Sequence, residues 1–99
     1  MSELRMMMPQ STLDLHGLLY TQAESAIRSF LEESLASGLE KVSIIHGKGL
    51  HTENGEGVLG DLTQKILRET GYAREAVNPK LQFGGSGALW IILKKKEKL

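Results

Sequence analysis

The sequence contains no cysteine. This absence excludes a disulfide framework and any metal site built from thiolates, and it is compatible with a reducing compartment. Apolar runs are also short: none approaches the ~18 residues of a membrane span. The first eleven residues likewise lack the apolar stretch of a signal peptide. We therefore expect a soluble, cytoplasmic protein with no membrane partner.

The chain lacks net charge as well, because twelve Lys and Arg balance twelve Asp and Glu over 99 residues. A neutral chain is not suited to bind a polyelectrolyte along its whole surface, although a local basic face can still contact phosphate. Aromatic residues make up only 5% of the sequence, which argues against strong autonomous binding to nucleic acid. The length fits one domain with one core.

Residues 11–17 alternate apolar and polar side chains, and this period of two predicts a strand. Residues 20–38 then place their apolar side chains on one helical stripe. Thr21 and Glu24 have the spacing of a capping box, and Gly38 stands where a left-handed cap would end the helix. The first half of the chain therefore predicts a strand followed by a helix.

The second half predicts one further helix and three further strands. A short buried strand over 41–45 runs into a glycine-rich loop, and a helix follows over 57–71. Its internal Gly60 costs ~1 kcal/mol relative to alanine. Residues 72–77 predict a weak strand, and residues 88–93 are the most apolar strand of the chain.

This order, β-α-β-α-β-β, predicts an α/β fold with two layers. Strands joined by helices are normally parallel, and right-handed crossovers in one direction place both helices on the same face of the sheet. Residues 88–93 are apolar at consecutive positions, as in a strand with neighbours on both sides. We expect a mixed sheet of about four strands in which this last strand is internal and antiparallel to its predecessor.

Asp14 and His16 are the first candidate functional residues. If Leu13 and Leu15 face the helices, Asp14 and His16 point to the uncovered face at the carboxyl end of the first strand, the edge where open α/β sheets usually bind ligands. A carboxylate there can orient an imidazole, raise its basicity or join it as a metal ligand. The alternative is that Asp14 holds a turn and His16 is an ordinary surface residue.

Two glycine motifs are the second group of candidates. "HGKG" at 46–49 ends the second strand at the same edge, where backbone amides and Lys48 could bind an anion. "GGSG" at 84–87 is either a turn or backbone packed closely against a ligand. Either motif could be only a turn. The Walker and dinucleotide-binding patterns are absent, so we expect no nucleotide or organic cofactor.

Together, "LDLHG", "IIHGKGLHTENG" and "GGSGALWIILK" resemble the small MutS-related, or Smr, domain family from about residue 12 to 95. The resemblance implies a two-layer α/β sandwich similar to the C-terminal domain of translation initiation factor three. It also implies an endonuclease that nicks structured or branched DNA or cleaves RNA. The chain would be a single-domain member, with a flexible tail over 1–11, the Smr domain over 12–95 and a basic tail over 96–99.

The resemblance also implies roles for particular residues. The Asp-x-His motif of the family maps onto Asp14 and His16 as catalytic residues: His16 is the general acid or base oriented by Asp14, or both hold a divalent cation such as Mg or Mn. The implied nucleic-acid-binding residues are His46, Gly47, Lys48, Gly49, Gly84, Gly85 and Gly87. The expected partner is DNA or RNA, with the ribosome as a further candidate. The alternative is a nucleic-acid or ribosome binding module without catalysis.

Overall fold

The structure is a computed structural model, and it describes residues 6–47 and 57–95. It contains four strands, two α-helices and two single-turn 3-10 helices, the latter labelled η. In chain order these are β1 (Ser11–Asp14), α2 (Tyr20–Ala36), β2 (Lys41–Ile45), α3 (Val58–Thr70), β3 (Ala73–Val77), η1 (Leu81–Phe83), η2 (Gly85–Gly87) and β4 (Ala88–Leu93).

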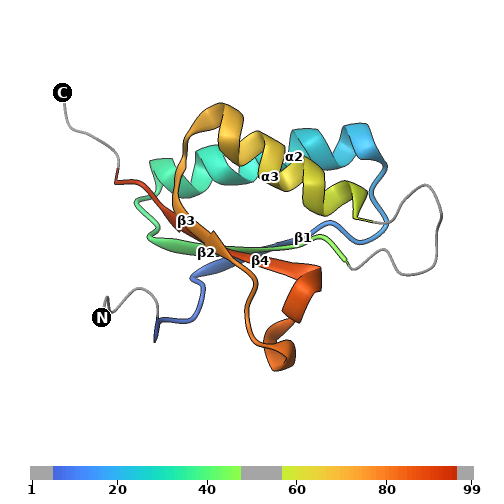
Figure 1. The fold of residues 1–99 in the computed structure, drawn as a ribbon. Helices are drawn as coiled ribbons and strands as arrows, with labels where there is room; N and C mark the ends of the chain where they lie inside the picture. The colour runs from blue at the N-terminus through green and yellow to red at the C-terminus, as the bar shows by residue number, and fades with distance from the viewer. Residues whose placement is uncertain (1–5, 48–56, 96–99) are drawn as a thin grey trace.

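The four strands form one mixed sheet in the order β1-β2-β4-β3. β1 and β2 are parallel, whereas β4 is antiparallel to both of its neighbours, β2 and β3. The α/β class, the mixed sheet and the internal position of the last strand are therefore confirmed. β4 is the last strand in the chain, yet it occupies a central place in the sheet (Figure 1).

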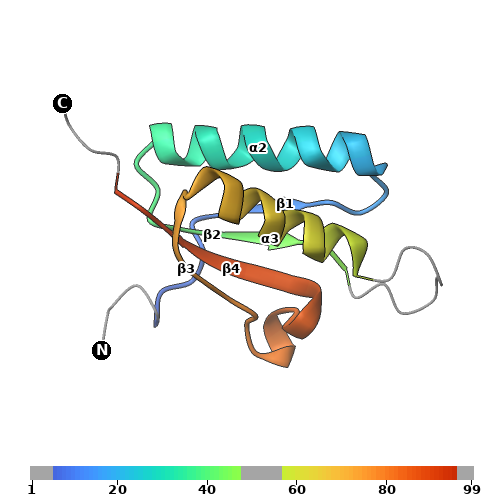
Figure 2. The same cartoon turned by 45° about the horizontal axis from the view of Figure 1, so that its top comes forward.

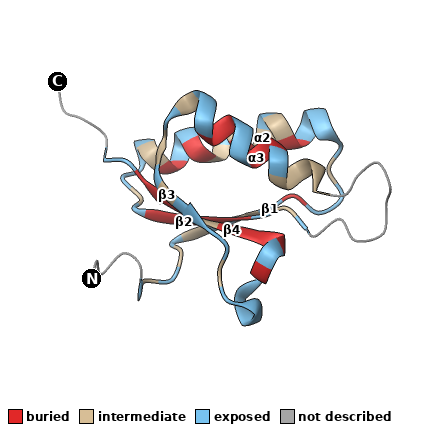
Figure 3. Ribbon diagram, in the orientation of Figure 1, coloured by how far each residue is buried: buried red, intermediate tan, exposed pale blue. Residues whose placement is uncertain are grey.

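Figures 1 and 2 show α2 and α3 on the same side of the sheet. Alternate residues of the strands pack against them, and most of the buried chain lies in this layer (Figure 3). The strand residues of this core are Val42, Ile44, Leu89, Ile91 and Leu93. Leu15, just after β1, is buried with them, and the partly buried strand residues Leu13 and Ala73 pack against them. Within the described residues, no helix is long and apolar enough to cross a membrane.

The other side of the sheet, which neither α2 nor α3 covers, is called the open face below. Its residues alternate with those of the core, and the strand register aligns them in rows across the sheet. They are Thr12, Asp14, Lys41, Ser43, Ile45, Glu75, Val77, Ala88, Trp90 and Ile92. Asp14, one of the predicted site residues, lies on this face.

The predicted capping box of Thr21 and Glu24 is wrong. The helix begins at Tyr20, and its N-cap is Leu19, two residues before Thr21. The Leu19 N–H donates to Oε1 of Gln22, with the two atoms 2.9 Å apart. A glutamine inside the first turn thus satisfies a terminal amide, and no polar residue has to flank the helix.

The predicted end of this helix is confirmed. Gly38 has a φ of +75°, the left-handed conformation expected after a helix. Its N–H donates to Leu35 O at 3.0 Å, and the N–H of Leu39 donates to Ser34 O at 3.0 Å. This pair of bonds is the Schellman motif, which turns the chain from α2 towards β2.

Candidate functional site

The ends of β1 and β2 lie side by side. Asp14 is paired with Ile45 in the parallel ladder, and the Leu15 N–H donates to Ile45 O at 2.9 Å. His16 follows the first of these strands and His46 follows the second. The backbone therefore brings the Asp-x-His motif and the start of the first glycine motif to one edge of the sheet.

Asp14 is exposed, and its carboxylate is bonded to the backbone. Its Oδ1 accepts the N–H of His16 at 2.8 Å, which ends the strand in a turn. The alternation of residues 11–17 predicted a longer strand, but β1 ends at Asp14, and the chain turns where the Asp14 carboxylate accepts the His16 N–H. Leu15 stays buried at 1% exposure, whereas His16 is exposed in the turn.

His46 is half-buried, and its ring packs against the first turn of α3. A Cβ added at Gly60 would lie 2.9 Å from Cε1 and 3.0 Å from Nδ1 of this ring. Gly60 therefore leaves the space that the imidazole occupies. The sequence had marked Gly60 only as a cost to the helix, although a glycine inside a helical pattern is itself a signal of close packing.

The ring of His46 is also held by a polar contact. Its Nδ1 lies 2.8 Å from Gly47 O. Because a carbonyl oxygen can only accept, this contact places a proton on Nδ1, and in the neutral ring it leaves the lone pair on Nε2. Packing and this contact together fix both the position and the tautomer of the ring.

The glycine motif at 84–87 is hydrogen-bonded to the motif at 46–49 through one backbone carbonyl. The N–H groups of His46 and Gly47 both donate to Gly87 O, each at 2.9 Å. These two amides are therefore bonded within the protein, so any anion contact from the loop would come from other groups. Lys48 and Gly49 lie outside the described residues.

The turn before β4 needs its glycines for conformation and packing. Gly84 and Gly85 have φ values of +117° and +52°, a region that other residues seldom adopt. A Cβ at Gly84 would also lie 2.9 Å from Cβ of Ala88. These glycines bring the Gly87 carbonyl to the loop after β2. Their contact with nucleic acid stays a prediction.

The same end of the sheet carries the first turns of both α-helices. Figures 1 and 2 show α2 and α3 starting beside the ends of β1 and β2. Aligned peptide dipoles give a helix start a partial positive charge, which favours an anion such as phosphate. Asp61 in the first turn of α3 offsets part of that charge. The field at this edge is suited to a phosphate that approaches from solvent.

The donor set limits what metal the site could hold. Within residues 6–47 and 57–95, no cluster of three or more His, Asp or Glu side chains could hold a metal ion. Asp14 and His16 offer one carboxylate and one imidazole. Two side chains are too few ligands to identify a metal, so a divalent cation such as Mg or Mn stays a prediction.

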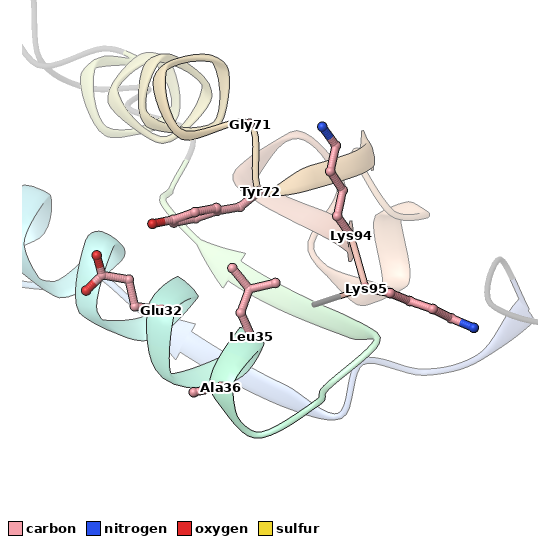
Figure 4. A pocket seen from close by; sticks show the side chains of 7 residues that line it. All are labelled: Glu32, Leu35, Ala36, Gly71, Tyr72, Lys94 and Lys95. Atoms are coloured by element: carbon pink, nitrogen blue, oxygen red, sulfur yellow. The ribbon is translucent and has the colours of Figure 1, made fainter. Parts of the chain in front are cut away.

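A hollow of about 360 Å³ lies at the opposite end of the molecule (Figure 4). It is lined by Leu35 near the end of α2, by Tyr72 after α3 and by Lys94 after β4, among others. It therefore lies by the last turns of both helices, away from all three motifs. The candidate site is an exposed edge and not this hollow.

The comparison with protein families agrees with the order and spacing of these motifs. A family model described as the Smr domain matches residues 13–94. The chain belongs to the Smr domain family. This Smr domain is 37% identical over 93 residues to an "Uncharacterized protein" of Treponema pallidum (strain Nichols), which covers 94% of the chain and 46% of that protein.

The Smr domain also resembles part of larger proteins. It is 31% identical over 85 residues to "Endonuclease MutS2" of Lactococcus lactis subsp. cremoris (strain MG1363), covering 86% of the chain but only 10% of that protein. The chain thus spans less than half of the Treponema relative and a tenth of the MutS2 relative.

Two solved structures share the fold. The Smr domain of Thermus thermophilus MutS2 aligns with a TM-score of 0.74 and 27% identity, covering 85% of this chain and 98% of that one. YdaL, a stand-alone small MutS-related protein from Escherichia coli, aligns with a TM-score of 0.80 and 30% identity, covering 88% and 67% respectively.

Proposed function

We propose that this Smr domain cleaves phosphodiester bonds of nucleic acid at the edge where β1 and β2 end. The relatives named Endonuclease MutS2 support nucleic acid as the substrate. One observation carries the proposal: Asp14 pairs with Ile45 beside His46, and Gly87 O binds the loop that begins there. Three motifs far apart in the sequence thus meet at one exposed edge.

His16 is the proposed general acid or base. It is exposed, it follows Asp14 in the turn, and an imidazole can both accept and donate a proton. On RNA it would take the proton of the neighbouring 2'-hydroxyl. The 2'-oxygen would then attack phosphorus, and the bond to the 5'-oxygen would break as that oxygen gains a proton. The positive ends of α2 and α3 at this edge would stabilise the charge that develops on the phosphate.

On DNA the 2'-hydroxyl is missing, so water must attack instead. A divalent cation, held by Asp14 and His16, would supply activated water. The two routes assign different tasks to the same two side chains. Asp14 and His16 can serve either route. The ribosome as a partner stays a prediction.

The second candidate function is a nucleic-acid binding module without catalysis. The bond from the His16 N–H to Asp14 Oδ1 favours it, because this bond alone gives the carboxylate a structural task. Asp14→Asn separates the two functions. Asparagine keeps an oxygen that can accept the same amide, but it removes the negative charge.

The test compares wild type, Asp14→Asn and His16→Gln on RNA, duplex DNA and branched DNA, with and without EDTA. Glu33→Gln, a change of an exposed acid on α2, is the matched control. We expect both site variants to unfold at the wild-type urea concentration and to cleave at least roughly 100-fold more slowly. Cleavage at the wild-type rate by both variants would refute the assigned roles.

Two further readouts separate the remaining alternatives. Nucleic acid that wild type binds but never cuts would establish the binding module in place of the nuclease. If RNA is cut, a single 2'-deoxy substitution at the cut site distinguishes the routes. Cutting that persists there excludes attack by the 2'-hydroxyl and leaves attack by water.

A further inference from the structure

The open face carries an aromatic pair that the proposed cleavage chemistry does not use. Trp90 is the only tryptophan of the chain and is partly exposed. The ring of Phe83 lies 5.4 Å from it between centroids, and the Lys41 ammonium lies 4.6 Å from its ring centroid. Both distances are typical of stabilising aromatic and cation–π contacts. Figure 1 shows η1, which contributes Phe83, on the side of the sheet away from the helices.

A hollow of about 250 Å³ lies beside this pair, lined by Lys41, Glu75, Val77, Trp90 and Ile92. Its wall is apolar and aromatic. Its charged groups are the Lys41 ammonium and the Glu75 carboxylate, and each has an interaction partner within the protein. Burial lowers the pKa of Lys41, and the nearby charge of Glu75 opposes that shift. The flat aromatic wall beside apolar side chains matches the flat face of a nucleobase.

The hollow and the candidate cleavage site share one face of the sheet. The register aligns Thr12, Ser43 and Trp90 in one row, with Val77 at its far end. Asp14 lies in the next row, two strands away from Trp90. Strand spacing and rise per residue put their Cα atoms ~12 Å apart. A short run of nucleotides spans that distance, so a strand cleaved at Asp14 can also reach Trp90.

We propose that the hollow beside Trp90 is a stacking subsite for one unpaired base of a single-stranded nucleic acid. The inference rests on the proposed function, and it names the substrate class of that site. In a duplex both faces of a base are stacked on its neighbours, whereas an unpaired base can stack on an aromatic ring. The subsite therefore favours single-stranded or splayed segments over continuous duplex.

The experiment uses Trp90 as its own reporter. Unlabelled single-stranded oligonucleotides are titrated into the full chain while tryptophan emission is recorded, beside a hairpin duplex of the same composition. Fluorescein-labelled copies give affinity by anisotropy. We expect single strands to bind and to quench Trp90, and the duplex to leave its emission unchanged. The quenching is measured on wild type, so it does not depend on any variant folding.

Phe83→Ala tests the aromatic pair directly. Phe83 is 40% exposed and supports the indole from η1. We expect the variant to bind single strands roughly 5- to 100-fold more weakly. Leu81→Ala is the matched control: Leu81 lies on the same turn and is 78% exposed. It should bind single strands as wild type does.

The failures are distinguishable. Binding without quenching, and with equal affinity for both variants, overturns the subsite and leaves the proposed function standing. If no nucleic acid is bound or cut at all, the proposed function fails and the subsite fails with it. If Trp90 emission changes when the protein alone is diluted and the protein sediments as a dimer, a second copy covers this face, and the subsite is refuted.

Discussion

Replacing Gly60 by alanine tests whether glycine, which is a weaker helix former than alanine, is needed in α3 because the His46 ring occupies the space beside it. The substitution adds one methyl group in the first turn of α3. That methyl carbon would lie 2.9 Å from Cε1 of His46, which is closer than real Cβ contacts come. The ring must therefore move, and its contact with Gly47 O, now 2.8 Å from Nδ1, must weaken.

Opposing effects set the size of the result. Alanine favours a helix over glycine by about 0.5–1 kcal/mol. Overpacking against the ring costs about 1–3 kcal/mol, and the weakened hydrogen bond contributes to that loss. Gly60→Ala should thus leave the free energy of unfolding unchanged or lower it by up to about 2.5 kcal/mol. In a His46→Ala background the clash is gone, and the same change should stabilise the protein by about 0.5–1 kcal/mol.

The assay is a double-mutant cycle of four urea titrations followed by Trp90 fluorescence. We expect a coupling energy of at least about 1 kcal/mol between positions 46 and 60. Equal stabilisation by Gly60→Ala in both backgrounds would show that the ring does not depend on this space. Cleavage assays on Gly60→Ala then show whether displacing the ring, with the imidazole still present, slows the reaction.

Two further predictions concern β2. Burial lowers the pKa of Lys41 below its ordinary 10.5, so between the lowered value and 10.5 the unfolded chain binds more protons than the folded one. The free energy of unfolding should therefore gain from Lys41 as pH rises through that window. Urea titrations at about pH 8 and about pH 10 should show a smaller rise for Lys41→Met than for wild type, and an equal rise would contradict this. Gln10→Ala removes the oxygen that accepts the N–H groups of Glu40, at 2.6 Å, and Lys41, at 3.0 Å. It should cost about 1–2 kcal/mol in urea unfolding. Gln10→Glu keeps an oxygen that accepts these N–H groups, so it should lower the free energy of unfolding by less than Gln10→Ala does. Equal losses of stability in the two variants would mean that these hydrogen bonds contribute little.

Local patterns predicted the elements well because apolar spacing reflects which face is buried. The strand over 41–45 matches β2 at both ends, and the apolar run at 88–93 matches the internal β4. The start of α2 at Tyr20 matches the predicted helix, but its cap was missed because Gln22 accepts the Leu19 N–H from inside the helix. The local spacing of Thr21 and Glu24 suited a cap that the folded helix does not use.

The candidate site was predicted as a location but not in its contacts. Strand alternation placed Asp14 on the uncovered face. The alternative in which Asp14 holds a turn describes the bond from the His16 amide to its carboxylate, but residue spacing alone could not choose between the two interpretations. The contact of His46 with Gly60 depends on how α3 packs on the sheet. The bonds to Gly87 O join backbone atoms, which leave no side-chain signal in the sequence.

The central position of β4 has a consequence for the order of events during synthesis. β2 lies between β1 and β4, so the first strand pair has no second neighbour until the last strand has been made. The carbonyl that binds the loop after β2 belongs to Gly87, just before that strand. A ribosome must therefore release the chain through β4 before the motif-bearing edge can close, and a nascent chain stopped short of β4 would lack the Gly87 carbonyl at that edge or its supporting strand.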